Sequence, residues 1–336
     1  MKKVVSILLA VAMLVLSALT LASCNTQTMT PAEKIAAGET LKVGVIQYMS
    51  HPSLDNCYEG IREALLASGI KMNVERQTGS AASADSDCSI TAENMVAAGY
   101  DIIIAIATPA AAAAFAATEN TDIPVIFCAV SDPVASGLVQ SVETPGDSCT
   151  GTSDVLDLAA QLALIRAMQP DVKSIGVLYT SSESNSLSNL AVFRTLCEQN
   201  SIELVAKAVQ SASDIPAAAA DLASRVDCIN NFTDNNVVNN LSVLLTAAEN
   251  NGIPVYGSEV EQVKKGCLAA VSIDYVALGK VTGEMALDVL RGADAATMAV
   301  KTITDATPVI NTEVLEALGM TMPEAYRDVA ETVTTD

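Results

Sequence analysis

The sequence has 336 residues, of which 50% are hydrophobic and 17% are charged, and its formal net charge is −21. This apolar content excludes a disordered or collagen-like chain, because enough apolar surface is available to offset the entropy lost on folding. The length favours two domains over one. Strong negative charge repels phosphate backbones, and no cluster of Lys and Arg interleaved with aromatics interrupts it, so we expect no nucleic acid partner.

The N-terminus has the pattern of a secretory signal. Lys2 and Lys3 precede an apolar run over residues 4–22, which is also long enough for a membrane anchor. The run ends in Leu21-Ala22-Ser23-Cys24, which resembles a bacterial lipobox, whose cysteine is lipidated and becomes the first mature residue. We therefore expect a lipoprotein signal peptide over residues 1–23 and a lipid anchor at Cys24 on the extracytoplasmic face of the membrane. Losing two lysines would take the formal charge from −21 to −23.

The remaining seven cysteines do not form a recognisable framework. Their number is odd, so they cannot all pair within the chain, and their spacings are wide. No CxxC occurs and there is one histidine, so we expect no metal and no cofactor. Several lie in apolar runs such as residues 125–128, which is typical of small buried hydrophobic side chains. These cysteines are Cys57, Cys88, Cys128, Cys149, Cys197, Cys228 and Cys267.

Strands and helices alternate after a short linker. Residues 24–40 are rich in Thr, Ala and Gly and indicate a linker between the lipid anchor and the folded domains. The segment 54–68 has apolar residues at helical spacing. Continuous apolar strands separated by helices predict parallel sheets that are covered on both faces. The predicted strands are 41–46, 70–75, 101–107, 124–130, 174–179, 202–209, 226–232, 253–257 and 267–273.

An internal similarity divides the chain into two lobes. Residues 42–46 resemble 174–178, the strand ending at Thr108 resembles that ending at Asp234, and residues 122–125 resemble 252–255, at offsets of 126–132 residues. Two similar parallel-sheet lobes, roughly 41–152 and 153–272, follow from this near-constant offset. Ligands of open parallel sheets bind beyond the carboxyl ends of the strands. The loops after seven of the strands are therefore expected to converge on one cleft.

Polar side chains gather in these loops. Thr108-Pro109 has the pattern of a helix N-cap followed by proline, which leaves free N–H groups for an anion. Ordinary capping and turn chemistry explains any one such loop equally well. Their shared position at strand ends favours a binding site. The loops are 47–52, 108–109, 131–133, 183–186, 233–235, 258–259 and 273–275.

Six ordered motifs, with the tail 308–320, resemble one family. They are similar to motifs of the tryptophan/tyrosine-type family of ABC-transporter substrate-binding proteins, and the match extends over about residues 41–330. The motifs are Ile46-Gln47 with 51–55, 105–111, 129–134, 175–179, 233–235 and 272–279. The resemblance implies an α/β fold of the type I periplasmic-binding class, two doubly wound parallel-sheet lobes joined by a three-crossover hinge. It places residues 41–152 with about 274–303 in lobe 1, and 153–273 with about 304–336 in lobe 2.

The resemblance also implies a function. Family members bind an aromatic or related small amino acid in the cleft between the lobes and deliver it to an ABC permease in the membrane. Carried over by position, the first lobe contributes contacts from Gln47, His51, Thr108, Ser131 and Asp132. The second lobe and hinge contribute Asn185, Ser186, Asp234, Ser258 and Asp274.

Physical chemistry distributes roles within this set. Hydroxyl donors for the carboxylate of a zwitterion are available at Thr108, Ser131 and Ser186, and Asp234 and Asp274 are candidates to hold its ammonium group. The acidic residue that commonly precedes the His-Pro pair in the family is absent, since Ser50 stands there. Stacking partners are few, chiefly Tyr48, Phe127, Phe232 and Tyr275.

Enzymatic functions are disfavoured. The chain has one histidine, His51, and lacks GxSxG, GxxxxGK[ST] and GxGxxG motifs, although paired carboxylates such as Asp132 and Asp234 resemble those used in glycoside hydrolysis. Two other binding functions remain open. A protein that signals to a membrane receptor would have the same pocket, and a variant of the fold could bind another small solute such as a sugar.

Overall fold

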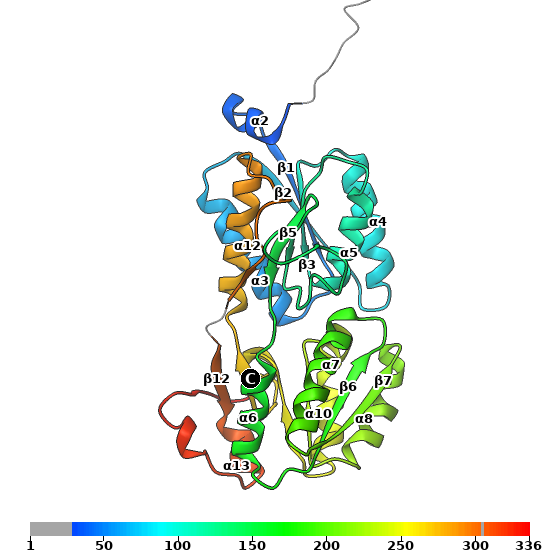
Figure 1. The fold of residues 1–336 in the computed structure, drawn as a ribbon, viewed down its shortest axis with the longest axis vertical. Coiled ribbons are helices and arrows are strands. Elements are labelled where there is room, and N and C mark those ends of the chain that lie inside the picture. Colours follow the sequence, from blue (N-terminus) through cyan, green and yellow to red (C-terminus); the bar gives the residue numbers. More distant parts are fainter. Residues whose placement is uncertain (1–28, 304–305) are drawn as a thin grey trace, which may run out of the picture.

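The computed structural model describes residues 29–303 and 306–336, which form two lobes stacked along the long axis of the molecule (Figure 1). The expected signal peptide and Cys24 lie outside these ranges. None of the helices in the described ranges combines the length and the apolar character needed to cross a membrane.

Lobe 1 is built on a parallel sheet whose core is almost wholly aliphatic. Helices α3 (Pro52–Ala67) and α12 (Tyr275–Leu290) cover one face, and α4 (Ala84–Ala97) and α5 (Thr108–Thr118) cover the other (Figure 1). Because both faces are buried, the two strands at the centre of the sheet, over residues 102–106 and 125–128, are continuously apolar. In spatial order they are β11 (Lys301–Thr302), β5 (Cys149–Ser153), β4 (Val125–Cys128), β3 (Ile102–Ile106), β1 (Leu41–Gln47) and β2 (Met72–Thr78).

Lobe 2 repeats this architecture with two adjoining sheets. The parallel sheet has the order β7 (Glu203–Val209), β6 (Ser174–Thr180), β8 (Cys228–Asn230) and β9 (Val255–Tyr256). A second sheet has the order β10 (Ala269–Ser272), β12 (Thr307–Asn311) and β13 (Glu331–Val333), and β9 joins β10 through the hydrogen bond from Leu268 N to Val255 O.

Helices of lobe 2 enclose two separate apolar clusters, one on each face of the sheet. The first cluster includes α6 (Leu158–Met168), α7 (Ser184–Gln199) and α13 (Thr312–Ala317), and the second includes α8 (Ile215–Ala223) and α10 (Leu241–Glu249). Shorter elements complete the lobe: η1 (Ala212–Asp214), α9 (Asn235–Asn239), α11 (Val260–Lys264) and η2 (Glu324–Tyr326).

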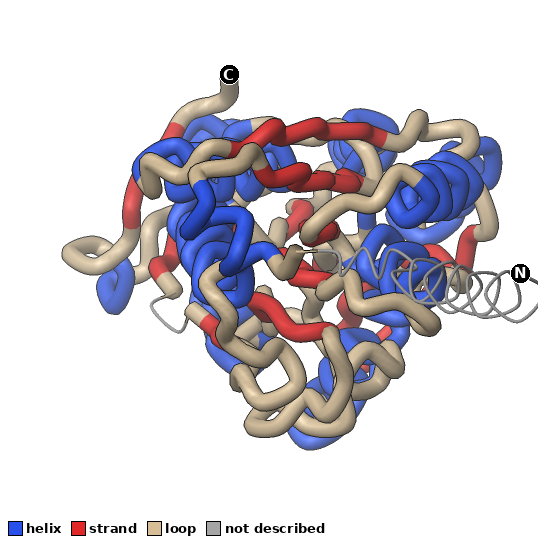
Figure 2. The backbone as a smooth tube through the Cα atoms, turned by 90° about the horizontal axis from the view of Figure 1, so that it is seen from above, coloured by secondary structure: helices blue, strands red, loops and turns tan. Residues whose placement is uncertain are grey.

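The chain passes between the lobes three times. It crosses after β5, between β10 and α12, and between β11 and β12. Figure 2, seen along the stacking axis, shows the lobes overlying each other, with helices (blue) beside most of the strands (red). The predicted fold, two parallel-sheet lobes with interspersed helices, is confirmed.

Five segments differ from the sequence-based expectation, a helix in the expected linker and the unpredicted strands β5, β11, β12 and β13. The segment expected to be a linker contains helix α2 (Pro31–Ala37), which has a Thr30/Glu33 capping box and an ion pair from Lys34 to Asp101 of 2.6 Å. Strand β5 was not predicted, because the sequence of residues 149–153 has no apolar run although all five residues are buried. The seven cysteines after Cys24 are all buried and unpaired.

Helices α3 and α12 approach each other very closely. A Cβ atom added at Gly279 would lie 2.1 Å from the carbonyl oxygen of Cys57, and one added at Gly60 would lie 2.0 Å from that of Val276. Glycine is therefore required at both positions. This contact fixes α3, whose first turn reaches the space between the lobes.

Candidate functional site

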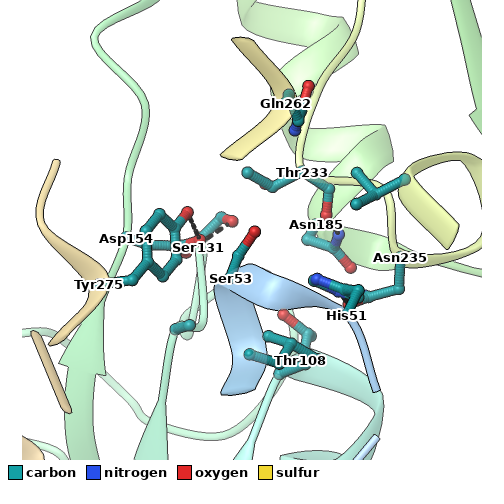
Figure 3. Close-up of a pocket in the computed structure, with 14 residues that line it drawn as sticks. His51, Ser53, Thr108, Ser131, Asp154, Asn185, Thr233, Asn235, Gln262 and Tyr275 are labelled. Carbon is teal, nitrogen blue, oxygen red and sulfur yellow. Dashed lines mark hydrogen bonds between the residues drawn. The ribbon is translucent and has the colours of Figure 1, made fainter. Parts of the chain in front are cut away.

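A cavity of about 350 Å³, including its mouth, lies between the two lobes. Figure 3 shows that both lobes contribute side chains to it. The volume open to the centre of a water-sized sphere is about 20 Å³, which is room for roughly one water molecule, so a larger solute requires the lobes or the lining side chains to move. Its lining residues are His51, Ser53, Leu54, Ala107, Thr108, Ala129, Ser131, Asp154, Asn185, Thr233, Asn235, Val238, Gln262 and Tyr275.

Two helix N-termini of lobe 1 reach the cavity. Neither α3, which starts after His51, nor α5, which starts after Ala107, has a side chain capping its first turn. Free N–H groups and the helix dipole favour an anion at such a position. Ala107 has φ 81° and ψ 153°, a region essentially reserved for glycine, and such strain of order 1–3 kcal/mol is typical of functional sites.

A buried carboxylate, Asp154, lies at another side of the cavity. Its Oδ1 accepts a hydrogen bond from Ser131 Oγ at 2.9 Å, and its Oδ2 accepts one from Tyr275 Oη at 2.9 Å (Figure 3). Asp154 is 3% exposed, and no ion pair to it occurs in the described part of the chain. Burial raises its pKa. A cationic ligand group would compensate this carboxylate.

Four buried polar atoms that line the cavity have no hydrogen-bond partner within the described ranges. They are His51 Nδ1, Thr108 Oγ1, Asn185 Oδ1 and Thr233 Oγ1. Each unpaired buried group costs roughly 1–3 kcal/mol. Four such groups on residues that line one cavity indicate a site that is completed by a polar ligand.

A second buried carboxylate, Glu183, lies behind the cavity wall. It accepts hydrogen bonds from the side chain of Asn185 and from the backbone and side chain of Asn235. Burial, followed by repulsion from Asp234, raises its pKa to about 8, although these donors oppose the shift. On the lobe 1 side, burial lowers the pKa of His51 to about 4, so the imidazole is neutral at pH 7.

Four of the predicted binding residues line the cavity, namely His51, Thr108, Ser131 and Asn185. The other six do not, and the two candidates for holding an ammonium group are among them. Asp234 is wholly buried and already accepts hydrogen bonds from Thr180, Ser186 and Val237. The hydroxyl of Ser186 is therefore engaged by Asp234 and is not free for a ligand. Asp274 is exposed and caps the N-terminus of α12.

The other three predicted residues also serve local structure. Gln47 donates to Met49 O and to Asp55, Asp132 accepts from Ala135 N in its own turn, and Ser258 donates to Asn231 O. The bonds of Gln47 to Met49 and of Asp132 to Ala135 are the turn chemistry that these loops permitted as an alternative, whereas Ser258 bonds to a residue of another loop.

Sequence reasoning missed Asp154, Ser53, Thr233, Asn235 and Gln262 as cavity residues. Asp154 follows the unpredicted β5, so the loop that carries it was not among those considered. Thr233 and Asn235 flank Asp234, which was chosen instead because of its charge. Of the expected stacking residues, Tyr275 lines the cavity, whereas Phe127 and Phe232 are fully buried in the cores.

Groups of three or more potential metal ligands do not occur among the described residues. The lining chemistry is therefore that of hydroxyls, amides, one neutral imidazole and one carboxylate.

Comparisons with known proteins agree with this architecture. The sequence profile of the family described as "ABC transporter substrate binding protein" matches residues 42–334. A tyrosine-binding protein from Clostridioides difficile (strain R20291) is 36% identical over 285 residues, which cover 83% of this chain and 81% of that protein.

Two solved structures have the same identity to this chain, 34%, and the same coverage, 88% of this chain and 100% of theirs. The ABC domain from Streptococcus pneumonia in complex with L-Trp has a TM-score of 0.84. A ligand-free, open substrate-binding protein with adhesive properties from Clostridium difficile has a TM-score of 0.67. The lobes of the present structure are thus arranged more like those of the L-Trp complex.

Proposed function

We propose that this chain, which belongs to the ABC transporter substrate-binding protein family, binds an aromatic amino acid in the cavity between its lobes. The observation that carries the proposal is Asp154, a buried carboxylate without a cationic partner, in the same cavity as two uncapped helix N-termini. A zwitterion supplies both missing charges.

The two charged groups of the ligand would bind at different places. Its ammonium group would pair with Asp154, which uses only two of its acceptor positions for Ser131 and Tyr275. Its carboxylate would accept from the first turns of α3 and α5 and from the unpartnered hydroxyl of Thr108.

An aromatic side chain fits the rest of the lining. Leu54, Val238 and Tyr275 supply apolar surface, and Tyr275 offers the one aromatic ring among the cavity residues. The tyrosine-binding relative and the L-Trp complex support this ligand class. A sugar would leave Asp154 without a counter-charge.

The test is a thermal-shift screen of the twenty amino acids and a panel of sugars, followed by titration calorimetry. At about 100 times its dissociation constant a ligand adds roughly 2.7 kcal/mol of stability, or on the order of 5–10 °C in Tm. We expect L-tyrosine or L-tryptophan to give the largest shift. A response to sugars alone would refute the proposed ligand class.

We further propose that the protein feeds an ABC permease from the extracytoplasmic face of the membrane, held there by a lipid on Cys24. Cells that lack the chain should then lose uptake of the labelled amino acid, whereas a receptor-signalling protein would leave uptake unchanged. Cys24→Ala should abolish incorporation of a fatty-acid analogue, because the lipid attaches to the thiol. Label that persists on this variant would refute the anchor.

A binding role without catalysis is also part of the proposal. His51, the chain's only histidine, contacts the amide oxygen of Asn235 rather than a nucleophile. Purified protein should therefore return a bound amino acid chemically unchanged, as mass spectrometry of the released ligand would verify.

A further inference from the structure

Two amide side chains of lobe 2 are oriented by one buried oxygen, and the side chain of Asn185 also donates to the backbone oxygen of Thr233 at 3.4 Å. Glu183 Oε2 accepts from Asn185 Nδ2 at 3.1 Å, from Asn235 Nδ2 at 2.7 Å and from Asn235 N at 3.0 Å. Both NH₂ groups therefore point at Glu183, and both amide oxygens point away from it. Glu183 Oε1 accepts separately from Asn236 N at 3.1 Å. A proton on Oε1 would leave the three contacts of Oε2 in place.

This orientation extends across the cleft to His51. The Oδ1 of Asn235 lies 3.3 Å from Nε2 of His51, which belongs to lobe 1. An amide oxygen only accepts, so Nε2 must carry the hydrogen and Nδ1 must be the unprotonated nitrogen. Neither Nδ1 of His51 nor Oδ1 of Asn185 has a hydrogen-bond partner within the described ranges, and both residues line the cavity (Figure 3).

We infer that Glu183 is a positioning residue that fixes the hydrogen-bond polarity of this part of the cavity, that is, which of its groups donate and which accept. The cavity wall there accepts hydrogen bonds and so selects ligands that carry a donor. We call His51, Asn185 and Asn235 the acceptor wall. A phenol hydroxyl or an indole N–H can donate to it, whereas a phenyl ring leaves its acceptors unpaired. The part that concerns selection rests on the proposed function; the part that concerns polarity does not.

The tautomer of His51 tests the polarity directly. Because His51 is the only histidine, protein labelled with [15N]histidine gives the ring signals of this residue alone. The lobes can be held closed without ligand by Ser136→Cys/Ser184→Cys, since these hydroxyls lie 3.0 Å apart across the cleft. We expect the Nε2–H tautomer in the closed protein. A predominant Nδ1–H tautomer would overturn the inference.

Variants separate positioning from stability. Glu183→Ala removes the shared acceptor and should give a mixture of tautomers, whereas Glu183→Gln keeps an oxygen that can take the place of Oε2 and should retain Nε2–H. Val177→Ala, in the buried core of lobe 2, controls for general destabilisation and should retain it too. If Glu183→Ala does not fold, Asn235→Ala removes the contact to His51 and should mix the tautomers. Retention of pure Nε2–H by the folded variant, Glu183→Ala or Asn235→Ala, would overturn the inference.

Selection is measured as the ratio of the Kd values for L-phenylalanine and L-tyrosine. Leaving the acceptor wall unpaired should weaken L-phenylalanine by roughly 5- to 150-fold relative to L-tyrosine. Asn185→Ala and Glu183→Ala should largely remove this preference, whereas Val177→Ala should keep it. Equal wild-type affinities would overturn selection by the wall. Failure to bind L-phenylalanine, L-tyrosine and L-tryptophan alike would refute the proposed function, and the locked protein would still decide the polarity.

Discussion

At Asp154, two hydroxyl donors satisfy part of a carboxylate that is removed from water. If this carboxylate pairs with the ammonium group of the ligand, Asp154→Asn keeps the shape and loses the charge-assisted bond. The loss should be roughly 1.5–3 kcal/mol, or about 10- to 150-fold in affinity by titration calorimetry.

Asp274→Asn is the matched control for this change. Asp274 is exposed and outside the cavity, and asparagine caps helices about as well as aspartate, so both affinity and Tm should stay close to wild type. If Asp274→Asn weakened binding while Asp154→Asn did not, the ammonium site would have to be moved to Asp274.

Buried ionisable groups should make the stability of the closed protein fall between pH 6.5 and 8. Burial raises the pKa of Glu183 to about 8 and that of Glu259 to about 7, so both bind protons in the native state that they release on unfolding. Their contribution is complete below pH 4.5 and is lost as pH rises through 7–8. His51, with a lowered pKa of about 4, acts in the opposite direction only below about 6.5.

Thermal unfolding in buffers of constant ionic strength checks this expectation. Tm should decrease from pH 6.5 to 8, and Glu183→Gln, which cannot ionise, should flatten the slope. A Tm that rises over this interval would show that these carboxyl groups titrate in the ordinary range.

Charged residues are also where the binding residues expected from the sequence differ from the residues that line the cavity. Asp234 and Asp274 follow strand ends, as binding residues do, but both are used to cap helices. Nothing in the sequence distinguishes such a cap from a ligand contact. Asp154 and Glu183 acquire their roles from burial by segments distant in the chain, Tyr275 in one case and Asn235 in the other.

Elements were predicted more successfully than residues, because periodicity is a local property. Each of the nine predicted strands overlaps an observed strand. Strands β11, β12 and β13 were omitted as well as β5 and α2, and the last two show a physical reason. Strand β5 is polar but buried between β4 and β11, and α2 is short and depends on Ile35 and Lys34 packing on lobe 1. Tertiary context, and not local propensity, determines both elements.

The contact between α3 and α12 gives a prediction at this scale. Gly279→Ala would place a methyl group 2.1 Å from the carbonyl oxygen of Cys57, so the helices must separate. Overpacking of this kind typically costs 1–3 kcal/mol, and the displaced α3 carries His51 and Ser53, so ligand affinity should fall as well. Urea unfolding and calorimetry measure the two effects.

The matched variant on the same helix is Glu284→Ala. Glu284 is exposed, so its loss should change stability by less than about 0.5 kcal/mol and leave binding unchanged. Wild-type stability of Gly279→Ala would mean that the two helices can separate without cost.

Across the whole molecule, the internal similarity of the sequence predicted two lobes and a cleft, but not their relative position. Hydrogen bonds join the lobes directly, from His51 to Asn235, from Asn56 to Glu261 and between Ser136 and Ser184. Few contacts of this kind, with three connecting segments, leave open and closed arrangements close in energy. A ligand that touches both lobes then favours the closed one.

Closure should therefore be measurable as compaction. Small-angle scattering of the wild-type protein should show a smaller radius of gyration when L-tyrosine or L-tryptophan is added, together with the increase in Tm. The oxidised Ser136→Cys/Ser184→Cys protein should be compact without ligand, and reduction should restore the wild-type response. This control fixes the scattering of the closed state independently of any ligand. An increase in Tm with an unchanged radius of gyration would keep the binding function and exclude hinge closure as its mechanism, because the ligand would then stabilise lobes whose arrangement it does not alter.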